Sequence, residues 1–356
     1  MNQMPATVKR SIELAGLFMA GAVVVLGKII VMPLVLAFFL SILLMPIYRL
    51  FIKLRLPEIM AIALAILCLG VFATLVGWLF YSQVASLLED FPTIQKNITI
   101  HLDNLSAWIN RSFGLSRGDQ ASFINEHSTR LLSILENILQ RSINSVTDFL
   151  IFFGLLPVYI FLIILYRHLF LQFMLMWVKK DEHVKMREVV PQLERAVKHY
   201  LLGLLIQFTY ITLLLGITLM ALGIEHGLLI GILFAFLNLI PYLGPLIGNI
   251  LGILITLAAS SSAGDIIIVF LVITIVQLLD NNILMPRIVG GQVKINALVS
   301  IVAIFIGGAL AGVTGMFIAM PTVAVLKIIF DHSTHFKQWG VLFGHAIPAG
   351  NPLYEQ

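Results

Sequence analysis

The stretch from Gly227 to Ala259 reads GLLIGILFAFLNLIPYLGPLIGNILGILITLAA, and it decides the fold class of this chain. It carries no charged residue, and an apolar run of this length is typical of a membrane segment rather than of a water-soluble core. Its middle, Pro241-Tyr-Leu-Gly-Pro245, places two prolines and a glycine within five residues. Each proline removes a backbone donor and clashes with the preceding turn. The stretch therefore predicts two half-helices around a break.

The length of each half indicates how this stretch meets the membrane. About 14 residues give about 21 Å of helix, which is short of the roughly 30 Å hydrocarbon core. A re-entrant hairpin therefore fits better than two spans, with a single tilted and kinked helix as the alternative. A second broken stretch, Ala297 to Ile329, repeats the pattern. Its small residues and proline favour close helix packing, with a hairpin tip as the alternative, and they are Gly307, Gly308, Gly312, Gly315 and Pro321.

The overall composition agrees with a membrane protein. Of the 356 residues, 60% are hydrophobic and 11% are charged, against roughly a quarter charged in soluble domains. The net charge of +4 comes from short basic clusters between apolar runs, which argues against nucleic-acid binding. Cys68 is the single cysteine, so neither an intramolecular disulfide nor a cysteine-based metal site can form. We expect no metal site and no cofactor.

Apolar windows elsewhere in the chain predict the remaining transmembrane helices. The apolar unit from Ser11 to Phe51 is long enough for two spans. Four further spans follow at Ile59 to Tyr81, Phe149 to Leu169, Tyr200 to Leu222 and Ile266 to Leu279. With the two broken or re-entrant stretches of the C-terminal half, the prediction is an all-α integral membrane protein of about eight transmembrane segments.

The region between the third and fourth spans is different in character. Its hydropathy drops, yet apolar residues keep helical spacing, first at Leu102, Leu105, Trp108 and Ile109 and later at Leu131, Leu135 and Ile138. This pattern predicts an extracytoplasmic cap of amphipathic helices over 83–147. The basic residues at 9–10, 49–55 and 179–198 place both termini in the cytoplasm.

These predictions divide the chain into five regions. The N-terminal spans occupy 1–82 and the cap occupies 83–147. A fourth span with a cytoplasmic amphipathic segment follows over 148–199. The broken helices of a transport half then fill 200–330, and a cytoplasmic tail completes the chain at 331–356.

Polar residues gather beside the breaks of the C-terminal half. Backbone groups released by a break must be buried in protein or line a water-filled cavity, and many secondary transporters bind substrate and ions at such places. The candidate residues of a substrate or ion path are Asn238, Pro241, Tyr242, Gly244, Pro245, Asn249, Gln277, Asp280, Asn282, Pro286 and Gly290. Asp280 could bind a cation or carry a proton, or it could be an ordinary helix-end group. The alternative for the breaks themselves is plain kinking of packed helices.

The sequence lacks the motifs of several enzyme classes. No GxxxxGK[ST], HExxH, GxSxG or paired CxxC motif is present. The sequence therefore lacks the residues that usually carry out ATP hydrolysis, zinc proteolysis and serine hydrolysis. We therefore expect a protein that is not an enzyme and whose transport is passive or driven by gradients. Glu225-His226 could form a proton relay, although a short loop is their ordinary explanation.

The C-terminal half resembles the AI-2E transporter family, also called the autoinducer-2 exporter or PerM-like family. The family element Pro-Tyr-aliphatic-Gly-Pro is similar to Pro241-Tyr-Leu-Gly-Pro245, with Asn238 before it. A second element, Asn then Pro then Gly, resembles Asn282, Pro286 and Gly290. A glycine-rich third element ending in Gly-Met and a Pro resembles the run from Gly307 to Pro321. Many relatives have Gly before the motif Asn, where this chain has Asp280-Asn281-Asn282.

The resemblance implies a bacterial inner-membrane transporter that forms a homo-oligomeric ring, with a pentamer as one form. Family members are associated with export of autoinducer-2 and with sodium or lithium antiport against protons. The prediction is therefore a secondary transporter that works by alternating access and either exports a small polar solute or couples to ions. Na⁺(Li⁺)/H⁺ antiport is the first alternative, and a passive channel or membrane scaffold is the second. The expected partners are the lipid bilayer, further copies of the chain, a small polar solute, and Na⁺ or H⁺.

Overall fold

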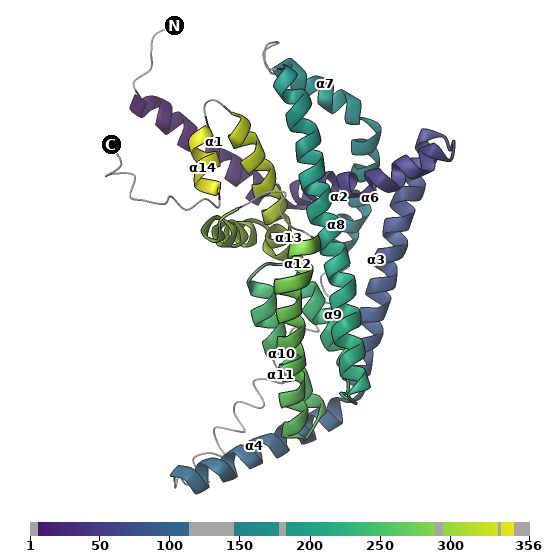
Figure 1. Ribbon diagram of the computed structural model, residues 1–356, viewed down its shortest axis with the longest axis vertical. Coiled ribbons are helices and arrows are strands. Elements are labelled where there is room, and N and C mark those ends of the chain that lie inside the picture. Colours follow the sequence, from purple (N-terminus) through teal and green to yellow (C-terminus); the bar gives the residue numbers. More distant parts are fainter. Residues whose placement is uncertain (1–5, 114–145, 178–182, 289–294, 334–335, 345–356) are drawn as a thin grey trace. The chain divides into compact units, whose positions relative to one another are not determined.

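The computed structural model describes residues 6–113, 146–177, 183–288, 295–333 and 336–344 (Figure 1). These residues are almost entirely helical, and their only β pairing is an isolated bridge between Ile295 and Gly344. The chain forms two compact units. The first consists of 1–69, 150–202 and 291–356, and the second of 70–149 and 203–290. We describe each unit by itself.

The first unit is built on α2 (Lys28–Lys53), the start of α3 (Glu58–Glu89) and α6 (Val146–Leu165). It also contains α1 (Ala6–Leu26), α7 (Arg167–Trp177), the start of α8 (His183–Ala221), α13 (Ala297–His332) and α14 (Lys337–Phe343). Its core joins Leu44, Ile62 and Ile160, each at most 2% exposed. The first apolar unit, predicted to hold two spans, forms two helices that meet at Gly27. The helix α2 is long and apolar enough to cross a membrane, and a crossing by α1 stays a prediction.

The predicted fourth span, Phe149 to Leu169, is wrong at its C-terminal end. The helix α6 ends at Leu165, and α7 leaves it at an angle of 66°. Arg167 explains the bend: its guanidinium donates to the carbonyl of Ile164 at 2.8 Å and pairs with Glu58 at 2.8 Å. The Arg167 side chain satisfies a backbone carbonyl in the last turn of α6, so the helix ends here and the apolar span does not continue.

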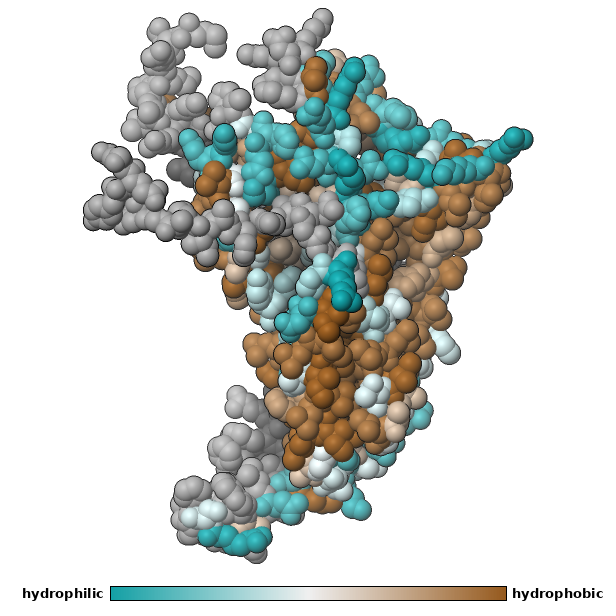
Figure 2. All heavy atoms as spheres, viewed as in Figure 1, coloured by the Kyte–Doolittle hydropathy of each residue, from teal (hydrophilic) through white to brown (hydrophobic). Residues whose placement is uncertain are grey.

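The second unit packs apolar faces of α8, α9 (Gly227–Leu237) and α11 (Ala263–Leu279) around one core. Ile211, Phe234 and Ile273 lie at its centre and are at most 1% exposed. The unit also contains α4 (Phe91–Phe113), α10 (Leu243–Ala259), a π-helical turn η2 (Asp280–Leu284) and α12 (Met285–Ile288). Figure 2 shows hydrophobic side chains over the outer faces of α10 and α11, as a lipid-facing surface requires.

The break in the Gly227 to Ala259 stretch is confirmed. The helices α9 and α10 are separated by residues 238–242, and Tyr242 has a φ of 67°. The two helices pack antiparallel, because a Cβ on Gly248 would meet the Phe234 ring at 2.5 Å and one on Gly252 would meet Ile230 at 3.2 Å. They therefore form a hairpin, with arms of 11 and 17 residues instead of two equal halves.

The second broken stretch also folds back on itself. Ala311 and Gly312 leave the helical conformation inside α13, and Gly312 has a φ of 60° and a ψ of −143°. In a continuous helix, Gly307 and Gly315 would lie about 12 Å apart. Instead, a Cβ on either glycine would collide with the carbonyl of the other. The structure therefore confirms a hairpin whose arms are 297–310 and 313–332, with Gly308 against Met316 and Pro321 buried in the second arm.

The described helices agree with a membrane protein. By length and composition, five helical segments could cross a membrane, namely Lys28–Lys53, Glu58–Leu87, Met186–Ala221, Ala263–Arg287 and Ala297–His332, the last of which is the α13 hairpin. The bent pair α6 and α7 makes a sixth if it is one span, and α9 and α10 are shorter apolar helices. The all-α membrane class with broken segments is thus confirmed.

Several predicted boundaries moved. The helix of the predicted third span, α3, continues past Tyr81 to Glu89. The helix of the predicted fifth span, α8, begins at His183, so the basic segment before Tyr200 belongs to the same helix as the span. The first half of the predicted cap is the amphipathic helix α4. Leu131, Leu135 and Ile138 lie outside the described residues, and the side of the membrane on which the cap lies stays a prediction.

Candidate functional site

A buried carboxylate lies at the junction of three helices in the second unit. Asp280 is 1% exposed. Its Oδ2 accepts hydrogen bonds from Gln207 Nε2 at 2.9 Å and from Asn238 Nδ2 at 3.1 Å. Its Oδ1 accepts from the hydroxyl of Tyr210. We name these four side chains the Asp280 cluster.

Local structure explains why the four side chains meet. Gln207 and Tyr210 are three residues apart on α8, so they lie on the same face of that helix. Asn238 is the C-cap of α9, directly at the hairpin break. Asp280 is the first residue of η2, where the helix widens from α to π geometry. Such π turns interrupt the regular ladder and recur at functional sites.

The tip of the α9–α10 hairpin holds Asn238 in place. The amide of Gly244 donates to the carbonyl of Ile240 at 3.0 Å, and that of Leu243 to the carbonyl of Pro241 at 2.8 Å. A Cβ on Gly244 would collide with the backbone of Leu237 and Asn238. Only glycine therefore permits this tip, which sets the position of the Asn238 amide.

The Asp280 cluster lacks a compensating positive charge. Its three donors are neutral side chains, and no Lys, Arg or His in the described part of the chain forms an ion pair with Asp280. An isolated buried carboxylate is costly even when it is hydrogen-bonded. A bound proton or cation would offset this cost.

The second unit also contains buried acceptor oxygens without a hydrogen-bond partner among the described residues. Gln207 is 3% exposed, and its Oε1 has no hydrogen-bond partner among the residues that the structure describes. The same holds for Gln277 Oε1 and Asn249 Oδ1, whose amide nitrogens donate to Asn281 and to the Pro245 carbonyl. Carboxylate and amide oxygens are ligands that hard cations prefer. Within the described residues, no three His, Cys, Asp or Glu side chains group as for a metal ion.

The structure brings together only part of the predicted path. Asn238 and Asp280 contact each other, whereas Asn282 donates to the carbonyl of Leu278 and Tyr242 is 54% exposed. Pro286 is exposed on α12. Gly290 lies outside the described residues. A role in a substrate or ion path stays a prediction for all of the candidate residues.

Gln207 and Tyr210 were missing from the sequence-based candidates. Both lie inside the predicted span from Tyr200 to Leu222, where the surrounding apolar residues dominate the hydropathy. Polar side chains at membrane depth seldom face lipid. Their i,i+3 spacing within an apolar helix was the signal that could have identified them.

The helix α4 fastens the open end of the α9–α10 hairpin, away from the tip. Asn97 donates to the carbonyls of Ala258 at 3.1 Å and Ala259 at 2.8 Å, and His101 contacts the carbonyl of Ser260 at 2.7 Å. These contacts satisfy carbonyls at the end of α10. His226, at the start of α9, lies 3.3 Å from Asp90, so both arms are held at their base.

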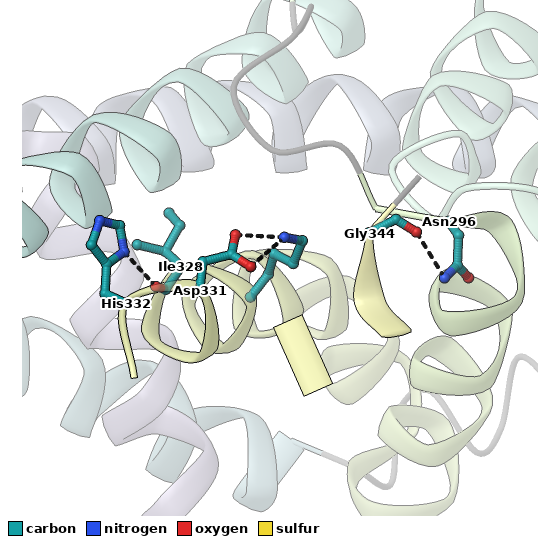
Figure 3. A network of polar contacts seen from close by, with 6 residues as sticks. Asn296, Ile328, Asp331, His332 and Gly344 are labelled. Carbon is teal, nitrogen blue, oxygen red and sulfur yellow. Dashed lines mark hydrogen bonds and ion pairs between the residues drawn. The ribbon is translucent and has the colours of Figure 1, made fainter. Parts of the chain in front are cut away.

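A separate polar network closes the base of the α13 hairpin in the first unit (Figure 3). Asn296 caps α13 by accepting from the amide of Val299 at 2.8 Å, and it donates to the carbonyls of Leu342 and Gly344. In the second arm, Asp331 forms an ion pair with Lys327, one turn earlier in the same helix. These residues anchor the segment around α14 to α13, and they serve the fold.

Comparison with known sequences gives a consistent result. The sequence model of the AI-2E family transporters matches residues 14–335. The chain is 25% identical over 312 residues to YrrI of Bacillus subtilis (strain 168), which is named only provisionally as a transport protein, and the match covers 86% of this chain and 87% of YrrI. It is 24% identical over 318 residues to the AI-2 transport protein TqsA of Escherichia coli (strain K12), covering 88% of this chain and 89% of TqsA.

Proposed function

This chain belongs to the AI-2E family of membrane transporters, and from that premise we propose that it is an ion-coupled secondary transporter in which Asp280 is the coupling group. It is a multi-pass membrane protein and not an enzyme. The observation that carries the proposal is the buried carboxylate of Asp280, which has three neutral donors and no basic partner among the described residues. Ionisable groups inside a membrane segment mark ion or proton paths.

The mechanism follows from the origin of the three donors. Two of the donors, Gln207 and Tyr210, belong to α8, and the third, Asn238, belongs to the tip of the α9–α10 hairpin. The acceptor, Asp280, lies at the end of α11. When Asp280 takes up a proton or a cation, its need for three donors falls. The hairpin tip can then separate from η2. The free energy of ion binding therefore differs between the arrangement in which the tip contacts η2 and the arrangement in which it does not. Alternating access requires such a difference.

The solute of this proposal is small and polar, as with the autoinducer-2 that the name of TqsA states for that relative. The free acceptors Asn249 Oδ1 and Gln277 Oε1 suit the hydroxyl groups of such a solute. The proposal places the protein in a bacterial inner membrane with both termini in the cytoplasm. It also includes assembly into a homo-oligomer, for which a pentamer is the first form to test.

One observation favours Na⁺(Li⁺)/H⁺ antiport as a second candidate function. The free Oε1 of Gln207 belongs to a side chain that already contacts Asp280, so carboxylate and amide oxygens are available together. These hard oxygen ligands would suit Na⁺ or Li⁺ as the transported ion itself. In that case Asp280 exchanges the metal ion for a proton and no organic solute is required.

Flux measurements in proteoliposomes test the proposal. A pH-sensitive dye would report proton movement while Na⁺, Li⁺, K⁺ or autoinducer-2 is added in turn. We expect a response to at least one addition, and we expect Asp280→Asn to abolish it while the protein still folds. Asp265→Asn is the matched control, because it makes the same change in the first turn of the same stretch of helix, α11.

Each other outcome has a distinct meaning. A response that survives in Asp280→Asn would remove Asp280 from the coupling step. Downhill movement without uphill accumulation would indicate a passive channel. Silence with every cation and with the organic solute would favour a membrane scaffold.

A further inference from the structure

A large cavity in the first unit has no part in the transport proposal. Its volume is about 980 Å³, and it lies between α2, the region around α7, and the start of α8. Most of its lining is apolar and includes Leu34, Phe38, Met45, Phe173 and Met174. The lining also contains the cationic residues Arg49, Lys53 and Arg167, together with His168.

The polarity of the cavity changes along α2. Leu34, Phe38 and Met45 line it along the helix up to Met45, and Arg49 and Lys53 line it in the last two turns. From Leu34 to Arg49 the helix rises about 22 Å, which exceeds the roughly 15 Å of one hydrocarbon leaflet. The cavity thus offers an apolar channel of acyl-chain length that ends in cations.

The cationic end retains a positive excess. Arg49 pairs with Glu194 at 2.9 Å and Arg167 pairs with Glu58 at 2.8 Å. Lys53 has no ion pair among the residues that the structure describes, and His168 adds a further titratable nitrogen. Arg49 is 62% exposed at its side chain despite its pair, so it can contact a second anion. Arginine and lysine side chains bind phosphate strongly.

The helix α7 gives the cavity an interfacial wall. It is bent by 66° from α6, none of its residues is buried, and Phe173 and Met174 expose apolar surface as they line the cavity. A short helix that turns away from a span and exposes apolar side chains is typical of the membrane interface. A lipid headgroup would lie at this level.

We infer that this cavity binds one anionic phospholipid of the surrounding bilayer. Its acyl chains lie along Leu34, Phe38 and Met45, and its phosphate contacts Arg49, Lys53 and Arg167. Basic pockets between membrane helices bind acidic headgroups in this way. A zwitterionic lipid would bring its own ammonium group to a positively charged rim, so the charge selects an anionic lipid.

Native mass spectrometry of the purified full chain tests this inference. Phosphatidylglycerol or phosphatidylcholine would be titrated into detergent-solubilised protein. We expect tighter retention of phosphatidylglycerol, and we expect Lys53→Gln to weaken it about fivefold. Lys53 is exposed, so this change leaves the core intact. Lys28→Gln is the matched control, because it removes one cation from the other end of the same helix.

Three results would overturn the lipid site. Equal retention of the two lipids by the unaltered chain would remove the charge selection. An equal loss in Lys28→Gln and Lys53→Gln would reduce the effect to net charge. Finally, Phe173→Cys in a Cys68→Ser background could form crosslinked dimers that phosphatidylglycerol does not suppress, which would show that a second copy of the chain covers the cavity.

Discussion

The two helical hairpins of this protein are built alike and differ in what their tips contact. In the α9–α10 hairpin of the second unit, Gly248 and Gly252 let the arms pack closely, and the tip carries Asn238 to Asp280. In the α13 hairpin of the first unit, Gly307 and Gly315 bring the arms together, and the turn at Ala311 and Gly312 offers no polar side chain. Glycine spacing therefore makes a hairpin, and the polar contact at the tip distinguishes the candidate site.

The comparison extends to the base of each hairpin. The helix α4 holds the carbonyls of α10 through Asn97, and Asn296 holds the segment around α14 against α13. Both bases are fixed by asparagine amides that donate to backbone carbonyls. In the proposed mechanism the tip of α9–α10 moves while these contacts keep its base fastened.

The largest expected effect is a loss of stability on substitution of Gly244, in the tip of the α9–α10 hairpin. In Gly244→Val the new side chain would collide with the backbone of Leu237 and Asn238, and overpacking against rigid backbone costs about 3 kcal/mol. We expect the thermal midpoint in detergent to fall strongly. Gly154→Val is the control, because nothing lies within 4 Å of a Cβ there. Equal midpoints for the two variants would show that the tip is not close-packed.

The next effect is expected from Tyr210→Phe, which removes one donor to Asp280 and leaves the ring. A hydrogen bond to a charged group contributes about 2 kcal/mol. Apparent ion affinity, measured as the half-saturating cation concentration in the dye assay, should change more than tenfold. Tyr81→Phe, at a 72% exposed position, should leave it unchanged. No shift in Tyr210→Phe would exclude the hydroxyl from the cluster.

A smaller effect is expected at the base of α9–α10. Asn97→Ala removes two hydrogen bonds to the end of α10, which together contribute about 1.5 kcal/mol. Hydrogen exchange should accelerate at the last turn of α10 and not at η2. Asn104→Ala, an exposed position on the same helix, is the control. Faster exchange at both places would mean that tip and base open as one unit.

The smallest effect on ion dependence is expected at the base of the α13 hairpin. Asn296→Ala removes an N-cap that contributes about 1 kcal/mol and two hydrogen bonds to the segment around α14, but none of these contacts touches the Asp280 cluster. We expect a modest drop in thermal midpoint and unchanged ion dependence of transport per folded molecule. An altered ion dependence would give the α13 hairpin a role in coupling, and the contrast between the two hairpins would fail.

Much of this contrast could be predicted from the sequence. Pro241 and Pro245 cannot continue a helix, and the short arms on either side predict a hairpin, so both follow from local chemistry. Asp280 was identifiable as an acid beside a break. The glycines from Gly307 to Gly315 predicted close packing. The turn at Gly312 could not be predicted, because a glycine allows the backbone angles of this turn but does not require them.

The partners of Asp280 could not be predicted in the same way. Gln207 lies 73 residues from Asp280 in the chain, so their contact is set by how α8 packs against α9 and α11. The bend at Tyr166 likewise depends on the distant Glu58, which pairs with Arg167. Local patterns fix breaks and helices, whereas tertiary packing decides which polar groups meet.

The most direct test of the central claim separates exchange from accumulation. For the solute whose movement the dye assay identifies as ion-coupled, labelled exchange at equal concentrations and gradient-driven uptake would be measured in the same proteoliposomes. We predict that Asp280→Asn retains exchange and loses uphill accumulation, while Asp265→Asn retains both. Gradient-driven accumulation by Asp280→Asn at the level of the unaltered chain would contradict the account.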